Sequence, residues 1–269
     1  MRRMFGRDPS RWCRVGASAL VLVMAGACGA PTQIAMPDIN ALRCGSTPAP
    51  VPQPSSLPAL AQVGAEERVP LHGVIVHSGH GRAGPEPPIE VSGATERALA
   101  SELRAAATIA CELRTPAAAK RAGYVLSAYF TQGVGTHWTN WNLVDAGFDP
   151  TRPSMLLYAP RLGVQQLIGF SYWVRTAAPS GPDGFAGPAD AWHRHYGMCF
   201  DRTGLLEREN VKSPDLCRDT YVNGADIWML HAWVVPGAAN AWGTFAPLNP
   251  QLCSRTVPDI ERCPGVGSA

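Results

Sequence analysis

Two histidines in the segment WHRHYG (residues 192–197) are the first candidates for chemistry in this sequence. A strand points alternate residues to the same face, so His193 and His195 would project together, and Cys199 would join them if the strand continued. Neighbouring imidazoles on one face are suited to binding a transition metal ion. The alternative is that both histidines are hydrogen-bonded structural residues of a half-buried strand.

Two further histidines could complete such a site. In DIWMLHAWVV, His231 alternates with apolar residues, and an imidazole buried among them without a partner would be costly. In GVGTHWTNWN, glycines before His137 predict a loop that brings this residue over the sheet. Four imidazoles would complete a tetrahedral site, and three would leave a position for water or a substrate. Zn, Cu and Fe all accept such ligands.

A carboxylate beside these histidines would orient an imidazole or serve as a general base. No Glu occurs between Glu112 and Glu207, so within that stretch the sequence leaves Asp and His for these roles. Asp190, three residues before His193, is the predicted partner that orients an imidazole. The alternative is that Asp190 caps the turn after GFAGPA.

The first 27 residues have the composition of an export signal. An arginine-rich start is followed by the run VGASALVLVMAGA, which is too short to span a bilayer. The small residues before Cys28 fit ordinary signal cleavage and also resemble a lipobox, at which the cysteine receives lipid. The segment RRMFGR resembles a twin-arginine signal, so both export routes stay open.

The cysteines favour lipidation over ordinary cleavage. Of the eight cysteines, Cys13 would leave with the signal and Cys28 would carry the lipid. The remaining six form an even set, which is suited to disulfides in an oxidising compartment. They are Cys44, Cys111, Cys199, Cys217, Cys253 and Cys263. The prediction is an exported lipoprotein anchored on the extracytoplasmic side of the membrane.

The charge of the mature chain argues against a nucleic-acid partner. The full sequence has a net charge of +2, and residues 1–27 contain five Arg and one Asp, so their removal leaves −2. Proteins that bind nucleic acids need a basic face to displace counterions from phosphates. The expected partners are therefore the membrane, through the lipid, a metal ion and a small-molecule ligand.

Residues 28–68 are rich in Pro, Ser and Ala and predict an extended tether, which leaves residues 69–262 as a single globular domain. From Thr95 onward, apolar residues recur every three or four positions, which predicts a helix. Residues 115–123 carry a Thr N-cap, a first-turn Pro and a terminal Gly, which predict a second, short helix.

Five later segments are rich in β-branched and aromatic residues and are separated by loops of Gly, Pro, Asn and Asp. They are YVLSAYF, SMLLY, QLIGFSYWV, WHRHYGMCF and DIWMLHAWVV. Such a pattern predicts strands. The expected fold class is mainly β, an antiparallel sandwich or barrel that includes the cupin-like form, with an N-terminal helical segment.

Three tryptophans, Trp138, Trp192 and Trp233, stand beside or near the proposed ligands. They predict either an ordinary aromatic core or an aromatic-walled pocket next to the metal. The HSGHG segment is typical of a solvated loop. The alternative interpretation of this segment is a second, small metal-chelating site. The sequence lacks a G-x-S-x-G elbow, a P-loop, an H-E-x-x-H motif and a dinucleotide fingerprint, which removes the commonest hydrolase and nucleotide-enzyme classes.

The order AAAKRAGY, GTHWTNWNLVDAGFDPTRPSMLLY, LIGFSYWV and WMLHAWVVPGAANAWGTFAPLNP resembles a family of uncharacterised secreted bacterial proteins and lipoproteins with a G-x-H-[aromatic]-x-N segment after a helix. The resemblance covers residues 117–250 and implies export and a β-rich domain, with His137 at the family's histidine position. The H-x-H strand also resembles the metal strand of cupins by analogy of geometry, although the usual cupin Glu is missing after WHRHYG.

The sequence therefore predicts an exported lipoprotein that binds a transition metal ion through His137, His193, His195 and His231, for metal binding or delivery in the cell envelope. One alternative is a cupin-like metalloenzyme in which three histidines hold the metal beneath an open aromatic pocket. Another is a structural or interaction module without metal.

Overall fold

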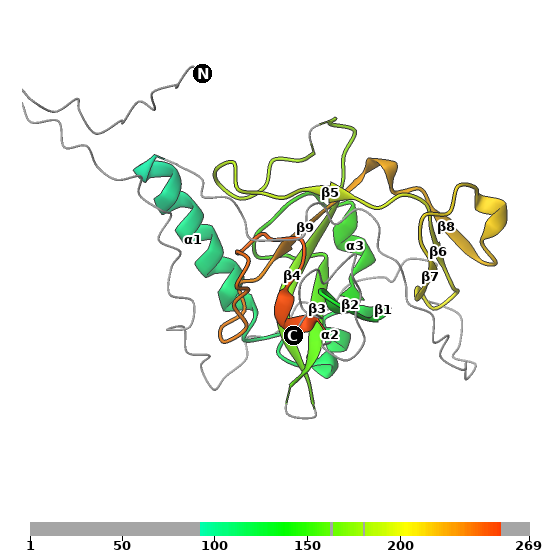
Figure 1. The fold of residues 1–269 in the computed structure, drawn as a ribbon, viewed down its shortest axis with the longest axis horizontal. Helices are drawn as coiled ribbons and strands as arrows, with labels where there is room; N and C mark the ends of the chain where they lie inside the picture. Colours follow the sequence, from blue (N-terminus) through cyan, green and yellow to red (C-terminus); the bar gives the residue numbers. More distant parts are fainter. Residues whose placement is uncertain (1–91, 162–163, 180, 254–269) are drawn as a thin grey trace, which may run out of the picture. The chain divides into compact units, whose positions relative to one another are not determined.

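The computed structural model describes residues 92–161, 164–179 and 181–253, all within one compact unit of the chain. A curled antiparallel sheet of six strands and a separate three-stranded sheet dominate this part (Figure 1). The two longest helices precede the first strand. The predicted mainly β fold class with an N-terminal helical segment is confirmed.

Several expectations concern parts of the chain outside the described residues. They are the export signal over residues 1–27, the lipid at Cys28, the tether to residue 68, the HSGHG segment, and the disulfide candidates Cys44 and Cys263. These stay predictions. Within the described part, no helix is long and apolar enough to cross a membrane.

Side chains set the ends of both N-terminal helices. Helix α1 (Gly93–Ile109) begins after Ser92, whose hydroxyl accepts a hydrogen bond from the backbone N–H three residues later at 3.2 Å. Helix α2 (Pro116–Arg121) begins after Thr115, which makes the same contact at 3.2 Å, and the chain leaves it through Gly123 at a φ of 85°. Both predicted helices are therefore present, and α2 has the Thr cap and the terminal Gly that the sequence predicts.

The large sheet has the strand order β1-β2-β3-β4-β9-β5, and every neighbouring pair is antiparallel. A short helix, α3 (Trp141–Val144), connects two of its strands. The chain makes a long excursion after β4 before β9 returns to pair with it. The strands are β1 (Val125–Thr131), β2 (Gly135–Thr139), β3 (Met155–Arg161), β4 (Val164–Arg175), β5 (His193–Arg194) and β9 (Ile227–Ala232).

Two apolar cores lie against the large sheet, whose strand residues alternate between its two faces. On one face, Phe170 belongs to a large apolar core that also contains Leu103 of α1. On the other face, Trp173 and Met229 belong to a smaller core shared with Phe200 of the small sheet. The second face is the one that carries the histidines.

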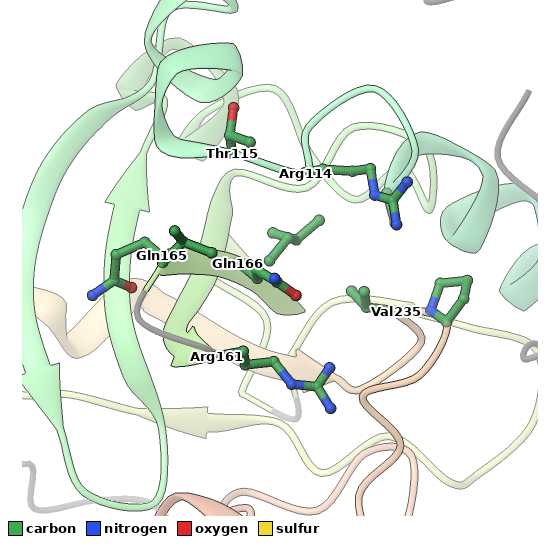
Figure 2. Close-up of a pocket in the computed structure, with 10 residues that line it drawn as sticks. Arg114, Thr115, Arg161, Gln165, Gln166 and Val235 are labelled. Atoms are coloured by element: carbon green, nitrogen blue, oxygen red, sulfur yellow. The ribbon is translucent and has the colours of Figure 1, made fainter. Parts of the chain in front are cut away.

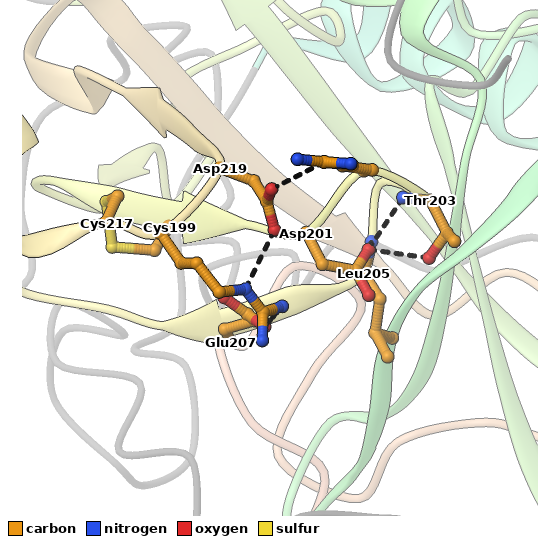
Figure 3. Close-up of polar contacts among 9 residues, drawn as sticks. Cys199, Asp201, Thr203, Leu205, Glu207, Cys217 and Asp219 are labelled. Carbon is orange, nitrogen blue, oxygen red and sulfur yellow. Dashed lines mark hydrogen bonds and ion pairs between the residues drawn. A yellow bond between two sulfur atoms is a disulfide. The ribbon is translucent and has the colours of Figure 1, made fainter. Parts of the chain in front are cut away.

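The small sheet has the order β7-β6-β8, from β6 (Met198–Phe200), β7 (Leu206–Arg208) and β8 (Thr220–Val222). A disulfide joins Cys199 to Cys217 beside it (Figure 3). Cys111 and Cys253 are also disulfide-bonded. Four of the six predicted disulfide cysteines therefore form disulfides.

Carboxylates brace the small sheet and its turns. Asp201 Oδ1 accepts hydrogen bonds from the backbone N–H groups of Thr203 at 2.8 Å and Leu205 at 3.0 Å, which closes the β6–β7 turn (Figure 3). Asp219 accepts from Arg218 Nε at 3.0 Å and Arg202 Nε at 2.8 Å. The hydrogen bond from Arg218 is the main reason why the pKa of Asp219 is lowered.

The prediction that WHRHYGMCF is one strand is wrong. The segment divides into β5, which pairs with β9, and β6, which belongs to the small sheet. Gly197 lies at the break with a φ of 55°, and a Cβ there would be 1.7 Å from the carbonyl oxygen of Val211. This close approach of two chain segments turns the backbone, so Cys199 does not share a face with His193 and His195.

Candidate functional site: a buried histidine cluster

The strand register brings two predicted ligands to one face of the large sheet. His137 on β2 lies opposite Leu157 on β3, which lies opposite Gly169 on β4. Two residues further along β4, Ser171 lies opposite His231 on β9. Residues directly opposite in neighbouring strands share a face, as do residues two apart in one strand. His137 and His231 therefore face the same side.

The edge strand β5 and the turn after it add the other two histidines. His193 lies opposite Met229, which is two residues before His231 on β9, so His193 shares their face. His195 follows β5, and its carbonyl oxygen is in close contact with Gly224, where a Cβ would lie 1.8 Å from it. The small residue at position 224 therefore allows the chain that carries His195 to pack closely.

The predicted loop position of His137 is wrong, because this residue lies within strand β2. The glycines that suggested a loop form a tight turn between β1 and β2, with φ values of 79° at Gly133 and 100° at Gly135. The glycines do shape the approach to His137, but they produce a hairpin in which the strand itself holds the imidazole.

The four histidines form one buried cluster. The ring centroid of His193 lies 5.2 Å from that of His195 and 5.3 Å from that of His231. The exposed fractions are 2% for His137, 8% for His193, 2% for His195 and 0% for His231. The structure therefore places the rings of His193, His195 and His231 next to one another, and His137 is linked to them through its electrostatic effect on His231.

Burial and neighbouring imidazoles act together on His231. Loss of solvent is the main cause that lowers the pKa of this histidine well below its usual value, followed by the charges of His193 and His137. His195 also lowers the pKa, whereas the hydrogen bond with the Pro247 carbonyl raises it. His231 is therefore neutral at neutral pH, as a metal-binding imidazole must be.

Hydrogen bonds to backbone carbonyls determine which ring nitrogen carries the proton in two of the histidines. The Nδ1 atom of His231 lies 2.7 Å from the carbonyl oxygen of Pro247, and Nδ1 of His193 lies 3.2 Å from that of Ala191. A carbonyl oxygen only accepts, so each hydrogen bond requires a proton on Nδ1. In the neutral ring, the lone pair is then on Nε2, the arrangement that many metal-binding histidines adopt.

A carboxylate that sequence reasoning missed lies beside His195. The distance from His195 Nδ1 to Glu209 Oε1 is 3.5 Å, and the Glu209 side chain is only 4% exposed. The backbone brings it there, because Val211 N–H donates to the Gly197 carbonyl at 2.8 Å and so pairs the segment after β7 with the one after β5. The signal in the sequence is one of the two glutamates in EREN, a segment that is typical of an exposed turn.

Asp190, the predicted orienting carboxylate, lies in different surroundings. Its side chain packs against Gly184, where any Cβ would collide with the carboxylate. Its charge also contributes to the raised pKa of Tyr172, for which burial is the main cause. The Nδ1 atoms of His193 and His231 lie within hydrogen-bond distance of carbonyl oxygens, and a role for Asp190 toward the histidines stays a prediction.

The three tryptophans near the proposed ligands all belong to the large core or pack against it. Trp233 lies edge-on to His231 with ring centroids 5.9 Å apart. Trp138 packs against Tyr158, with centroids 6.3 Å apart, and Trp192 packs against Phe148 at 6.0 Å. Trp233 is itself a buried member of the large core, and Trp138 and Trp192 pack against that core, so the ordinary core interpretation holds for all three.

The donor atoms of the cluster do not converge on a single point as the side chains stand. Among residues 92–161, 164–179 and 181–253, no group of three His, Cys, Asp or Glu has an arrangement that could hold a metal ion. A χ2 rotation of an imidazole changes the direction of its nitrogen atoms while leaving the ring in place, and this torsion is soft. The cluster therefore supplies the ligand types in proximity, and ring rotation determines whether they coordinate.

Comparisons with protein-family profiles, with curated proteins and with solved structures found no match to this chain.

Proposed function

We propose that this protein binds a transition metal ion through His137, His193, His195 and His231. The observation that carries the proposal is the gathering of four of the chain's seven histidines, from three separate segments, into one buried cluster. Clustered imidazoles raise the cost of protonation for one another, whereas a shared cation stabilises their neutral form. Zn, Cu and Fe are the candidate ions.

The spacing of the rings is compatible with a shared ion. Two imidazoles bound to one tetrahedral metal at about 2.1 Å have ring centres about 5 Å apart. The separations of 5.2 Å and 5.3 Å around His193 match this value.

The contacts around the rings support the same proposal. Metal-binding histidines commonly donate their second N–H to a carbonyl or a carboxylate, which orients the ring and strengthens the ligand. Pro247 and Ala191 provide such carbonyls to His231 and His193, and Glu209 is the carboxylate beside His195.

The proposed role is binding or delivery of the ion rather than catalysis at it. Four imidazoles complete a tetrahedral shell, whereas a catalytic metal keeps a position for water or substrate. The cluster is at most 8% exposed at any of its histidines, which is typical of a closed site. With the predicted export signal and the lipid at Cys28, the site of action is the cell envelope.

The test is elemental analysis of the full-length exported protein, purified without a histidine tag and incubated in turn with Zn, Cu and Fe salts. We expect one metal ion per chain in the parent and none in His193→Ala/His195→Ala. The matched control is His77→Ala/His80→Ala, which removes two histidines outside the cluster and should retain the ion. Circular dichroism would establish that each variant is folded.

Two outcomes would contradict the proposal. One is a parent protein that takes up none of the three metals. The other is a folded His193→Ala/His195→Ala variant that retains the ion while the control variant loses it, because the HSGHG segment would then be the binding site.

A further inference from the structure

A second candidate site is a cavity of about 410 Å³ beside the large core (Figure 2). It lies where the connection between α1 and α2, the β3–β4 hairpin and the segment after β9 come together. Cavities of this size are suited to small organic molecules. None of its lining residues is a histidine, so it is separate from the proposed metal site.

The charged residues that line this cavity are all positive. Arg114 and Arg161 contribute two guanidinium groups, and the lining residues include no Asp or Glu. Figure 2 shows the two arginines on opposite walls, with Gln166 and Val235 between them in this view. Arg161 Nη2 donates to the Gly237 carbonyl at 2.8 Å, which holds that guanidinium in place. Such an arrangement attracts an anionic group.

The backbone at Arg114 is fixed on both sides. Its carbonyl oxygen accepts a hydrogen bond from the N–H of Leu167 on β4 at 3.1 Å. The hydroxyl of buried Tyr158 donates to the carbonyls of Leu113 at 2.5 Å and Thr115 at 3.2 Å. The arginine therefore extends from a rigid position, which lowers the entropy lost when it binds a ligand.

The remaining lining is apolar and includes Ala110, Leu167, Val235 and Pro236. We infer that the cavity binds a small amphipathic organic anion, with an acidic head between Arg114 and Arg161 and an apolar body against this wall. Burial of the body contributes affinity, and the guanidinium groups provide selection for charge.

The test compares two fluorescent probes of similar shape, anilinonaphthalene sulfonate, which is an anion, and phenylnaphthylamine, which is uncharged. We expect the full-length protein to bind the sulfonate more tightly than the neutral amine. Arg114→Gln/Arg161→Gln should weaken sulfonate binding about tenfold or more, the usual effect of losing charged hydrogen bonds, and leave the amine unchanged. Arg121→Gln, which removes an exposed arginine outside the cavity, should have no effect.

Arg114→Lys provides a second measurement. Because this variant retains the positive charge, it should bind the sulfonate with an affinity within several-fold of that of the parent. Equal affinity for the two probes in the parent, or no sulfonate binding at all, would overturn the inference. Undiminished sulfonate binding by the double arginine variant would overturn it too, because the probe would then occupy another surface. Neither result depends on the metal site.

Discussion

At the scale of single residues, the hydrogen bond that one nitrogen of an imidazole makes determines whether the other nitrogen has a lone pair available for a metal ion. The Pro247 carbonyl holds a proton on Nδ1 of His231, and the Glu209 carboxylate lies 3.5 Å from Nδ1 of His195. A carboxylate in this position increases the basicity of the ring and therefore its strength as a ligand. Glu209 is a carboxylate in contact with the cluster, so the effect of its charge on metal binding can be tested directly.

We expect Glu209→Gln to lower the affinity for the metal about 10- to 100-fold, the usual effect of losing an orienting carboxylate. The change preserves the shape of the side chain while removing its charge. Competition with a chromogenic chelator would give the affinities. Glu207→Gln is the matched control, because Glu207 on β7 pairs with Arg218. The metal affinity of this variant should equal that of the parent. Equal affinities for all three proteins would exclude a role for Glu209.

At the scale of elements, local patterns predicted the two N-terminal helices and four of the strands. The apolar repeat of α1, the Thr115 cap of α2 and four of the five proposed strand segments hold in the structure. Face alternation also correctly placed His231 on the same face as Met229. What local patterns could not provide were contacts between distant segments: the close approach of Gly197 to Val211, which divides WHRHYGMCF, and the arrival of Glu209 beside His195.

Gly197→Ala tests whether this approach of two segments holds the cluster together. A Cβ at this position would collide with the Val211 carbonyl and would also be strained at positive φ, so we expect a loss of about 3 kcal/mol or more in the free energy of unfolding. Gly237→Ala isolates the strain, because Gly237 has a φ of 78° and no atom within 4 Å of a Cβ. It should cost about 1 kcal/mol.

Urea denaturation, with the disulfides intact, would give both values, and elemental analysis would give the metal content. We expect Gly197→Ala to lose metal under conditions where it is still folded, since His195 and Glu209 lie on the two segments that separate. Similar stability losses in the two variants would show that the contact with Val211 contributes nothing.

At the scale of the whole molecule, the proposed ligands span residues 137 to 231 and meet only when the large sheet is complete. Ions that bind such a site also stabilise the folded chain, because the unfolded chain cannot hold the same ligands together. The disulfide between Cys199 and Cys217 secures the small sheet next to the cluster. A disulfide-bonded domain of this kind is suited to an oxidising compartment, which is the compartment that the predicted export signal implies.

The predicted lipid anchor determines where this domain would meet its ion. If Cys28 is lipidated, the intact protein should enter the detergent phase in a cloud-point partition, because buried acyl chains dominate partitioning. Cys28→Ser should move it to the aqueous phase. Cys13→Ser is the matched control, since this cysteine belongs to the predicted signal and its loss should change nothing. If the parent itself is aqueous, the result favours ordinary cleavage before residue 28, and the domain would be released rather than held at the membrane surface.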